Sequence, residues 1–266
     1  MEEPQLTPEA PPEAPQAPAM SLGSRLLNVF ATPGDVFAEV KAAPETTANW
    51  LVPALILIAV SWVSAVVIFM QPSIKQQLSD LTAQAIQRQI DTGHISEQQA
   101  EQASVAGEKW AIIAAQIFAA LIPVLQGFVA PFFWGLLVWL LGAQFFKGHF
   151  PYMKAVEVVG LANMVSVLDV IVRTLLIVGL GNLYASPGPV LLVKQFDPQN
   201  PVHSSLASLS VMTLWLLAVR ASGLARLSGA SFTKCAVWVF GIWAAYTGFF
   251  IGIGALMQAG VKQITG

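Results

Sequence analysis

The stretch that decides the fold is residues 111–146, AIIAAQIFAALIPVLQGFVAPFFWGLLVWLLGAQFF, which carries no ionisable side chain over 36 residues. A membrane-spanning helix needs about 20 apolar residues, so this stretch is long for one crossing and short for two. Pro123 and Pro131 interrupt it, and a proline bends a helix because it lacks a backbone donor. We expect one long, bent and tilted helix. The alternative is a re-entrant hairpin that adds a sixth, partial crossing.

The composition of the whole chain is that of a membrane protein. Of its 266 residues 55% are hydrophobic and only 11% are charged, and the mean hydropathy is +0.65. Soluble domains carry charge on roughly a quarter of their residues. The net charge of −2 argues against nucleic acid as a partner. The single cysteine, Cys235, lies in an apolar stretch, which excludes an intrachain disulfide and disfavours a thiolate metal site.

Four further apolar stretches flank the central one and predict an all-α transmembrane bundle. Trp50 opens the first of them at the level where indole rings collect in membranes. Nothing before it resembles a cleavable signal, so we expect the first span to act as an uncleaved insertion signal. The predicted spans cover about residues 50–70, 111–146, 155–181, 206–224 and 235–257.

The segments outside the spans have distinct compositions. Residues 1–20 are rich in Pro, Glu and Ala and predict a disordered tail. Residues 21–44 predict two short amphipathic helices, one with Leu22, Leu26, Val29 and Phe30 on one face and Arg25 elsewhere. These helices suit the membrane interface, or alternatively a cytosolic surface of the same protein. The membrane domain is expected over 45–266, with an extramembrane helical hairpin at 72–109.

The distribution of basic residues indicates the orientation. Five spans place the two termini on opposite sides, and short loops next to spans keep their Lys and Arg in the cytoplasm. We therefore expect a cytoplasmic amino terminus. The inner set is Arg25, Lys41, Lys147, Lys154, Arg226 and Lys234, and the outer set is Lys75, Arg88, Lys109, Lys194 and Lys262.

Four segments carry a resemblance to a known family. They are RLLNVFATPGDVFAEVK at 25–41, FKGHFPYMKAV at 146–156, FDPQNP at 196–201 and SGASFTK at 228–234. The chain resembles bacterial members of the Yip family, membrane proteins named for the eukaryotic Ypt-interacting proteins. The resemblance implies five spans, a cytoplasmic amino terminus and, for a bacterial member, the inner membrane. In eukaryotes it implies roles in vesicle trafficking through small GTPases, but no catalytic residue transfers with it.

Polar residues within the spans are the candidate site. Asp169 and Arg173 are four residues apart, so both project from one face of the third span and can neutralise each other. Charges inside a bilayer are costly and generally pair and face the bundle interior. We interpret the pair as structural; the alternative is a polar pathway that includes Asn163 and Gln126 at similar depth. Arg220 is expected to snorkel from the inner end of the fourth span.

Glu157, one turn into the third span, is expected to reach the cytoplasmic interface. Glycines at 248, 252 and 254 in the last span suit close approach of another helix, from this molecule or from a second protomer.

No metal-ligand spacing, phosphate-binding loop or nucleophile motif is recognisable, so we expect neither an enzyme nor a cofactor. The function that we favour is that of a membrane-organising or protein-binding component. Its expected partners are the lipid bilayer and either another membrane protein or a second copy of this chain. The alternative is a small transporter, channel or lipid-handling protein.

Overall fold

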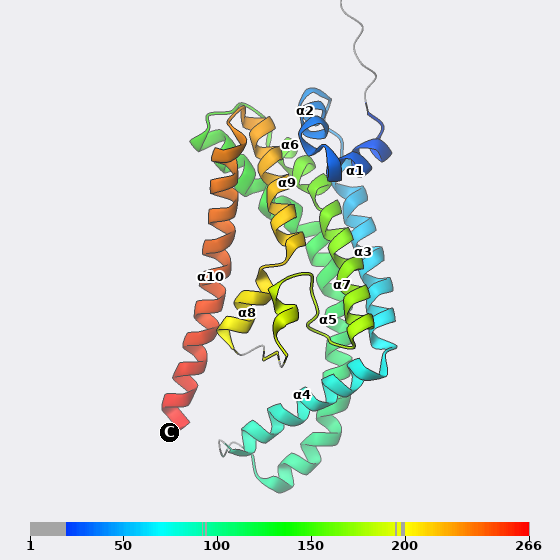
Figure 1. Ribbon diagram of the computed structural model, residues 1–266, viewed down its shortest axis with the longest axis vertical. Coiled ribbons are helices and arrows are strands. Elements are labelled where there is room, and N and C mark those ends of the chain that lie inside the picture. Colours follow the sequence, from blue (N-terminus) through cyan, green and yellow to red (C-terminus); the bar gives the residue numbers. More distant parts are fainter. Residues whose placement is uncertain (1–19, 92, 94, 195, 198–199, 266) are drawn as a thin grey trace, which may run out of the picture.

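The computed structural model describes residues 20–265 except 92, 94, 195, 198 and 199, and every regular element in that part is a helix (Figure 1). The predicted tail lies outside the described residues, apart from Met20. Five helical stretches are long and apolar enough to cross a membrane, which confirms the predicted all-α bundle of about five spans. They are Ala48–Phe69, Lys109–Phe145, Tyr152–Leu180, Val211–Ser228 and Phe232–Leu256.

Two short helices, α1 (Leu22–Ala31) and α2 (Pro33–Ala42), cover one end of the bundle (Figure 1). Ser21 caps α1 by accepting a hydrogen bond from the Ser24 backbone N–H at 3.2 Å. Their apolar faces are largely buried: α2 packs on α9 and α6, and α1 on α6 and α7. These faces therefore contact the same protein, whereas Leu27 on α1 is 71% exposed. The fully buried side chains are Val29, Val36, Phe37 and Val40.

The first two spans, α3 (Ala48–Phe69) and α5 (Glu97–Leu140), pack closely along their length. The long stretch is one continuous helix that passes through both Pro123 and Pro131 and ends in a π-helical turn, η1 (Leu141–Phe145). Small residues make the close packing possible. A Cβ at Gly127 would lie 3.2 Å from a backbone oxygen of α3, and one at Gly135 would lie 3.2 Å from the α6 backbone.

The third span consists of two helices, α6 (Tyr152–Ala162) and α7 (Met164–Leu180), with Asn163 at the break between them. Residues 154–162 of α6 are all buried, because α3, α5 and α9 surround that helix. On α7 burial is largely confined to the first turn, at Met164, Val165 and Val167. The lower part of this span is consequently much more exposed than the upper part.

The fourth span begins later than the predicted residue 206. A separate helix, α8 (Pro201–Ser208), precedes α9 (Val211–Ser228). Ser210 caps α9 by accepting from the Met212 N–H at 3.3 Å, and the Val211 N–H bonds to the Pro187 carbonyl at 2.9 Å. These bonds interrupt the helix at residues 209–210. Arg220 therefore lies midway along α9, not near its inner end.

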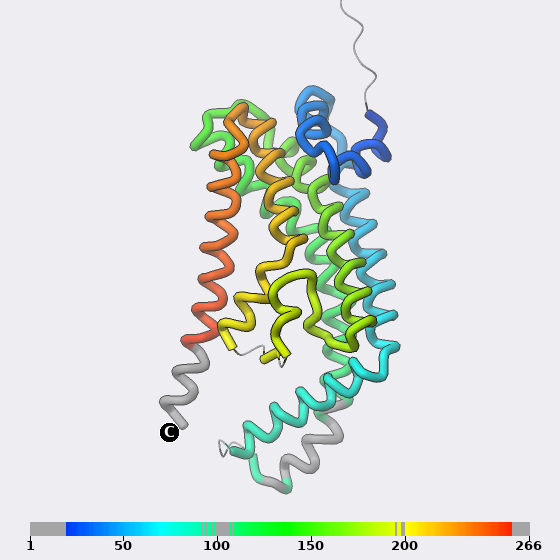
Figure 2. Tube along the Cα trace, viewed as in Figure 1, coloured from blue at the N-terminus to red at the C-terminus, as the bar shows by residue number. Residues whose placement is uncertain are grey.

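The opposite end of the molecule carries α4 (Pro72–Asp91), the short helix η2 (Pro189–Leu192) and α8, as Figure 2 shows. Helix α4 packs along α5, whose first turns run without a break into the second span. Gln77 on α4 ties this helix to the end of α7: its amide nitrogen donates to the Gly181 carbonyl, and its Oε1 accepts from Leu183 N at 3.0 Å.

The last span, α10 (Phe232–Thr265), is the least buried of the five. Its principal contacts are with α9 and α8, and it stands apart from α7 (Figure 1). A Cβ placed on Gly248, Gly252 or Gly254 would meet no atom within 4 Å. The small-residue face predicted in this span therefore has no neighbour among the described residues of this chain.

Candidate functional site: charged residues in and beside the spans

The Asp169–Arg173 pair forms on α7 with the geometry that its spacing predicts. Arg173 Nε donates to both carboxylate oxygens of Asp169, at 3.0 and 2.9 Å. The pair is not enclosed by the bundle, because the side chains are 36% and 22% exposed for Arg173 and Asp169. We expected the pair to face the bundle interior, and its side chains are only partly buried. Helix α7 packs on α3 and α9, and Ile177 further along it is buried, so the pair lies partly exposed on a helix that belongs to the bundle.

Arg220 is the buried charge in the middle of the bundle, and its environment differs from the predicted snorkelling. Its Nη2 donates to Asn163 Oδ1 at 3.0 Å, and its guanidinium carbon lies 4.7 Å from the centroid of the Trp134 ring. An aromatic face attracts a cation, more strongly when both are removed from water. Three spans thus meet at Arg220: α9 supplies the cation, α5 the ring, and the α6–α7 break the amide.

Gln126 does not join either group. It is exposed on α5, and no hydrogen bond of the described residues includes it. The five predicted site residues therefore separate into three places: the Asp169–Arg173 pair, the buried Arg220–Asn163 contact, and isolated Gln126. No continuous polar pathway joins these three places through the described part of the chain.

A larger polar network, which the sequence analysis missed, holds α1 and α2 onto the membrane domain. Arg25 Nη2 pairs with Glu39 Oε1 at 2.8 Å, so the two short helices are joined by a charge pair. Arg25 Nη1 also donates to Asn49 Oδ1 at 3.2 Å, at the start of α3. Asn49 Nδ2 then donates to Glu157 Oε2 at 2.6 Å, on α6. Lys154 Nζ lies 3.1 Å from Glu157 Oε1 and ends the chain of contacts.

The network is buried and electrically balanced. Glu157 is only 1% exposed, and Asn49, Lys154 and Arg25 are also buried. Two cations oppose two carboxylates, so their formal charges cancel and every charge has a partner of opposite sign. Buried charges are tolerated when they are paired and hydrogen-bonded. We expected Glu157 to reach the cytoplasmic interface; its side chain is instead buried by contacts with Thr46, Asn49 and Lys154.

A signal for this network was present in the sequence. Arg25 is three residues after Leu22 and four before Val29, so it lies on the apolar face of α1 rather than elsewhere. Glu39 likewise shares a face with Val36. A charged residue on the buried face of an amphipathic helix implies a partner of opposite charge. The identity of that partner depends on tertiary contacts, which the spacing does not give.

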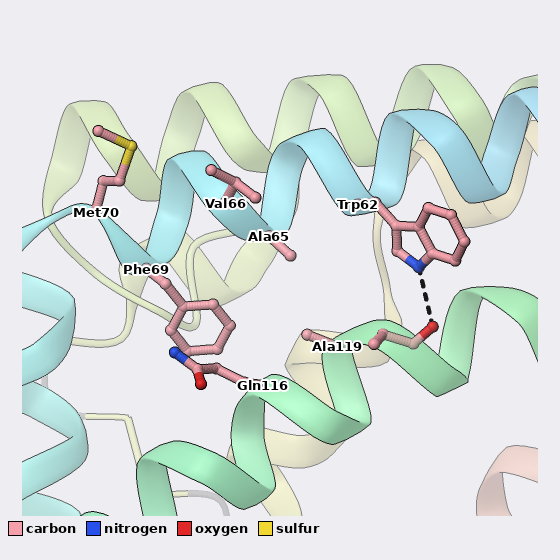
Figure 3. Close-up of a pocket in the computed structure, with 8 residues that line it drawn as sticks. Trp62, Ala65, Val66, Phe69, Met70, Gln116 and Ala119 are labelled. Atoms are coloured by element: carbon pink, nitrogen blue, oxygen red, sulfur yellow. Dashed lines mark hydrogen bonds between the residues drawn. The ribbon is translucent and has the colours of Figure 1, made fainter.

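A groove of about 480 Å³ lies between α3 and α5. Figure 3 shows Trp62, Val66 and Phe69 on α3 facing Gln116 and Ala119 on α5. Trp62 Nε1 crosses the groove and donates to the Ala120 carbonyl at 3.0 Å. Apart from Gln116 and this indole N–H the lining is apolar, and the groove lies within two spans. Its surface is suited to contact with lipid chains.

No group of three His, Cys, Asp or Glu residues in the described part of the chain is arranged to hold a metal ion. His94 lies outside the described residues. His203 is in α8, and its Nδ1 accepts from the Asp197 N–H at 3.0 Å. The polar contacts of the described residues thus serve mainly to join helices.

Five apolar helical spans, covered at one end by two amphipathic helices, define a multi-pass membrane protein. A family model described as the Yip1 domain matches residues 27–254. The chain therefore belongs to the Yip1 domain family, which confirms the resemblance seen in the sequence. The match includes the second half of α1 and all of the residues of the buried network except Arg25. No curated protein and no solved structure matches the chain.

Proposed function

We propose that this Yip1 domain protein is a non-enzymatic component that binds another membrane protein through the end covered by α1 and α2. The observation that carries the proposal is the buried chain from Glu39 through Arg25 and Asn49 to Glu157. It fixes two extramembrane helices to the membrane domain, so their outer surface is held in one position. A rigid surface loses less conformational entropy on binding than a mobile one.

The outer surface of α1 has a feature suited to a partner. Leu27 is 71% exposed there, opposite the buried Val29 face, and Arg25 beneath it is already paired. The eukaryotic role that the family resemblance implies, in trafficking with small GTPases, is also one of binding rather than catalysis. The proposed orientation places this end in the cytoplasm.

The test is site-specific crosslinking on the full chain in its native membrane. A photoreactive residue at position 27 is expected to give a reproducible crosslinked protein, identified by mass spectrometry. The same residue at position 192, which is exposed at the opposite end, is the matched control. Repeated recovery of no adduct from position 27, or of the same adducts from both positions, would contradict the proposal.

A second function, lipid handling or transport, is favoured by the position of the Asp169–Arg173 pair. The pair is partly exposed on a span, next to an apolar groove between α3 and α7 that includes Thr174 and Leu175. A charged pair at such a position can lower the barrier for a polar group to enter the bilayer. Reconstituted vesicles that show no lipid or solute movement beyond protein-free controls would exclude this function.

A further inference from the structure

Four basic side chains from four segments meet around the turn between α9 and α10. Arg226 is in the last turn of α9, and Lys234 is in the first turn of α10. Lys41 Nζ, from α2, donates to the backbone carbonyl of Arg226 at 3.0 Å. Lys147 precedes Gly148, where a Cβ would lie 2.7 Å from Ser228 Cα. The Lys147 segment therefore lies directly against the same turn.

None of these four cations has a carboxylate partner in the described part of the chain. The three ion pairs found there use Arg25, Lys154 and Arg173 instead. The guanidinium of Arg226 lies over Gly34, where a Cβ would be 2.9 Å from Nη2. Asp35 adjoins this contact in sequence, but no ion pair joins it to Arg226. The turn thus presents a surplus of positive charge.

The backbone at Lys147 is held in an uncommon conformation. Its φ of 55° makes it the one non-glycine residue with a positive φ in the described chain. A residue outside glycine pays a free-energy cost there and keeps it only when neighbouring contacts impose it. The following Gly148 N–H donates to the Gly142 carbonyl at 2.9 Å, which fixes the turn. The side chain of Lys147 is exposed, and the hydrogen-bonded turn fixes the position of its backbone.

A groove of about 390 Å³ runs beside these cations. It is lined by Ser222, Ala225, Arg226, Gly229, Ala230 and Phe232. The lining therefore includes one arginine and one aromatic residue, Phe232, which is 51% exposed. This combination of a fixed cation, small residues and an apolar side is suited to a ligand that is both anionic and amphipathic.

An aromatic pair places this groove at the edge of the membrane. The rings of Phe145 and Trp238 are in contact, with centroids 4.5 Å apart and planes tilted by 45°, and the two residues are 60% and 39% exposed. Trp238 is one helical turn deeper in the span than Lys234, and Phe145 is two residues from Lys147. Exposed indoles concentrate at the boundary between hydrocarbon and headgroups. The cations beyond the pair therefore lie at the depth of lipid phosphates.

We propose that the α9–α10 turn is a binding site for the phosphate of an anionic membrane lipid. Arg226 donates to the phosphate oxygens, because a guanidinium matches their geometry. Lys147 and Lys234 flank the same phosphate, while Phe145 and Trp238 contact the first part of the acyl chains. The bound lipid would add to the contacts that already join α9, α10 and the Lys147 turn. This inference rests on the spans and is independent of the proposed protein partner.

The experiment measures lipid binding to the full chain in detergent by native mass spectrometry. The probes are phosphatidylglycerol, phosphatidylcholine and inorganic phosphate. The variant K147Q/R226Q/K234Q is expected to lose phosphatidylglycerol affinity by roughly tenfold or more, given a contribution of about 1 kcal/mol per basic residue near an anionic surface. The control K75Q/K109Q/K194Q makes the same change in charge at the opposite end and is expected to bind as the wild type does.

Folding is controlled with the variant K147R/R226K/K234R, which keeps all three charges and is expected to retain most of the affinity. Equal phosphatidylglycerol binding by the wild type and the glutamine variant would overturn the site. So would equal wild-type affinity for phosphatidylcholine, because the surplus charge would then play no part. Binding of inorganic phosphate alone with the same dependence on the three cations would overturn the assignment to a lipid.

Discussion

The side-chain amide of Asn49 donates to Glu157 Oε2 at 2.6 Å and so joins the first turn of α3 to the middle of α6. The two residues are 108 positions apart in the chain. One turn of α6 further on, Gly160 allows the backbone of Trp50 to approach closely. A polar contact and a close-packed contact thus lie side by side in the same helix pair. Arg25 of α1 adds a third contact here, because its Nη1 donates to Asn49 Oδ1 at 3.2 Å.

The first prediction concerns the charge of Glu157. Glu157→Gln leaves Lys154 buried without its counter-ion, and removing one partner of a buried pair costs about 3–5 kcal/mol in soluble proteins. We expect a clear fall in the thermal unfolding temperature in detergent. Lys154→Met combined with Glu157→Gln should recover much of that loss. Glu45→Gln, which neutralises an exposed acid nearby, is the control. An unfolding temperature of Glu157→Gln equal to that of the control would contradict the buried pair.

The second prediction compares two glycines in spans. A Cβ at Gly160 would overlap Cα and Cβ of Trp50, whereas one at Gly241 would meet nothing within 4 Å. We expect Gly160→Ala to separate α6 from α3 and to lower thermal stability by an amount typical of overpacking, about 1–3 kcal/mol. Gly241→Ala should be neutral or slightly stabilising, because alanine favours helix over glycine. The same effect at both positions would show that α3 and α6 do not pack so closely.

The spans could be predicted from sequence because bilayer thickness alone sets the length of an apolar helix. The tilted helix through Pro123 and Pro131 needed only the length and the absence of charge. The breaks at Asn163 and at residues 209–210 could not be predicted in the same way. Each depends on partners distant in sequence, such as the Pro187 carbonyl that accepts from the Val211 N–H. The start of the fourth span was consequently predicted about five residues too early, at 206 instead of Val211.

The candidate site was predicted less completely than the fold. Spacing on one helix gave the Asp169–Arg173 pair, because both partners lie on a single element. Burial of Arg220 and Glu157 depends on which residues contact them, and Thr46 and Asn49 contact Glu157 from 111 and 108 residues away in sequence. Gly127 and Gly135 were not recognised as packing positions. They are eight residues apart, which is twice the four-residue spacing of the glycines at 248 and 252. The last-span glycines were more prominent in sequence, yet they have no neighbour.

The third prediction concerns Arg220, a buried cation for which the described residues provide no carboxylate partner. Asn163→Leu removes the acceptor of Arg220 Nη2, and an unsatisfied buried polar group costs about 1–3 kcal/mol, more when it is charged. We expect this variant to unfold at a lower temperature. Arg220→Met with Asn163→Leu removes both groups and should recover most of the loss. The matched control is Gln126→Leu, a change of an exposed amide on another span. If the double variant were less stable than Asn163→Leu, Arg220 would contribute more than the contact with Asn163.

The fourth prediction is the orientation in the membrane. Reporter fusions that are active only outside the cytoplasm are expected to give signal near residue 100 and near Ser204. Fusion near Ser228 should give none, because the unpaired cations Arg226 and Lys234 adjoin that turn and retain it in the cytoplasm. Residue 100, in the first turn of α5, and Ser204, in α8, belong to the end opposite α1 and α2 (Figure 1). Ser228 ends α9, which packs on α2. The reverse pattern of signals would invert the proposed orientation.

The last prediction concerns Asp169 and Arg173. Each single change, Asp169→Asn or Arg173→Leu, leaves one charge in a span, which costs about 2.5–3.5 kcal/mol at the centre of a bilayer. Both single variants should therefore be less stable in lipid nanodiscs than the wild type, and the double variant should regain much of the difference. Because the pair is only partly buried, the loss should be smaller than for Glu157→Gln. A double variant that is stable yet loses lipid movement in vesicles would identify a functional pair. Equal stability of the wild type and both single variants would contradict a pair within the apolar layer, and Asp169 and Arg173 would then face water.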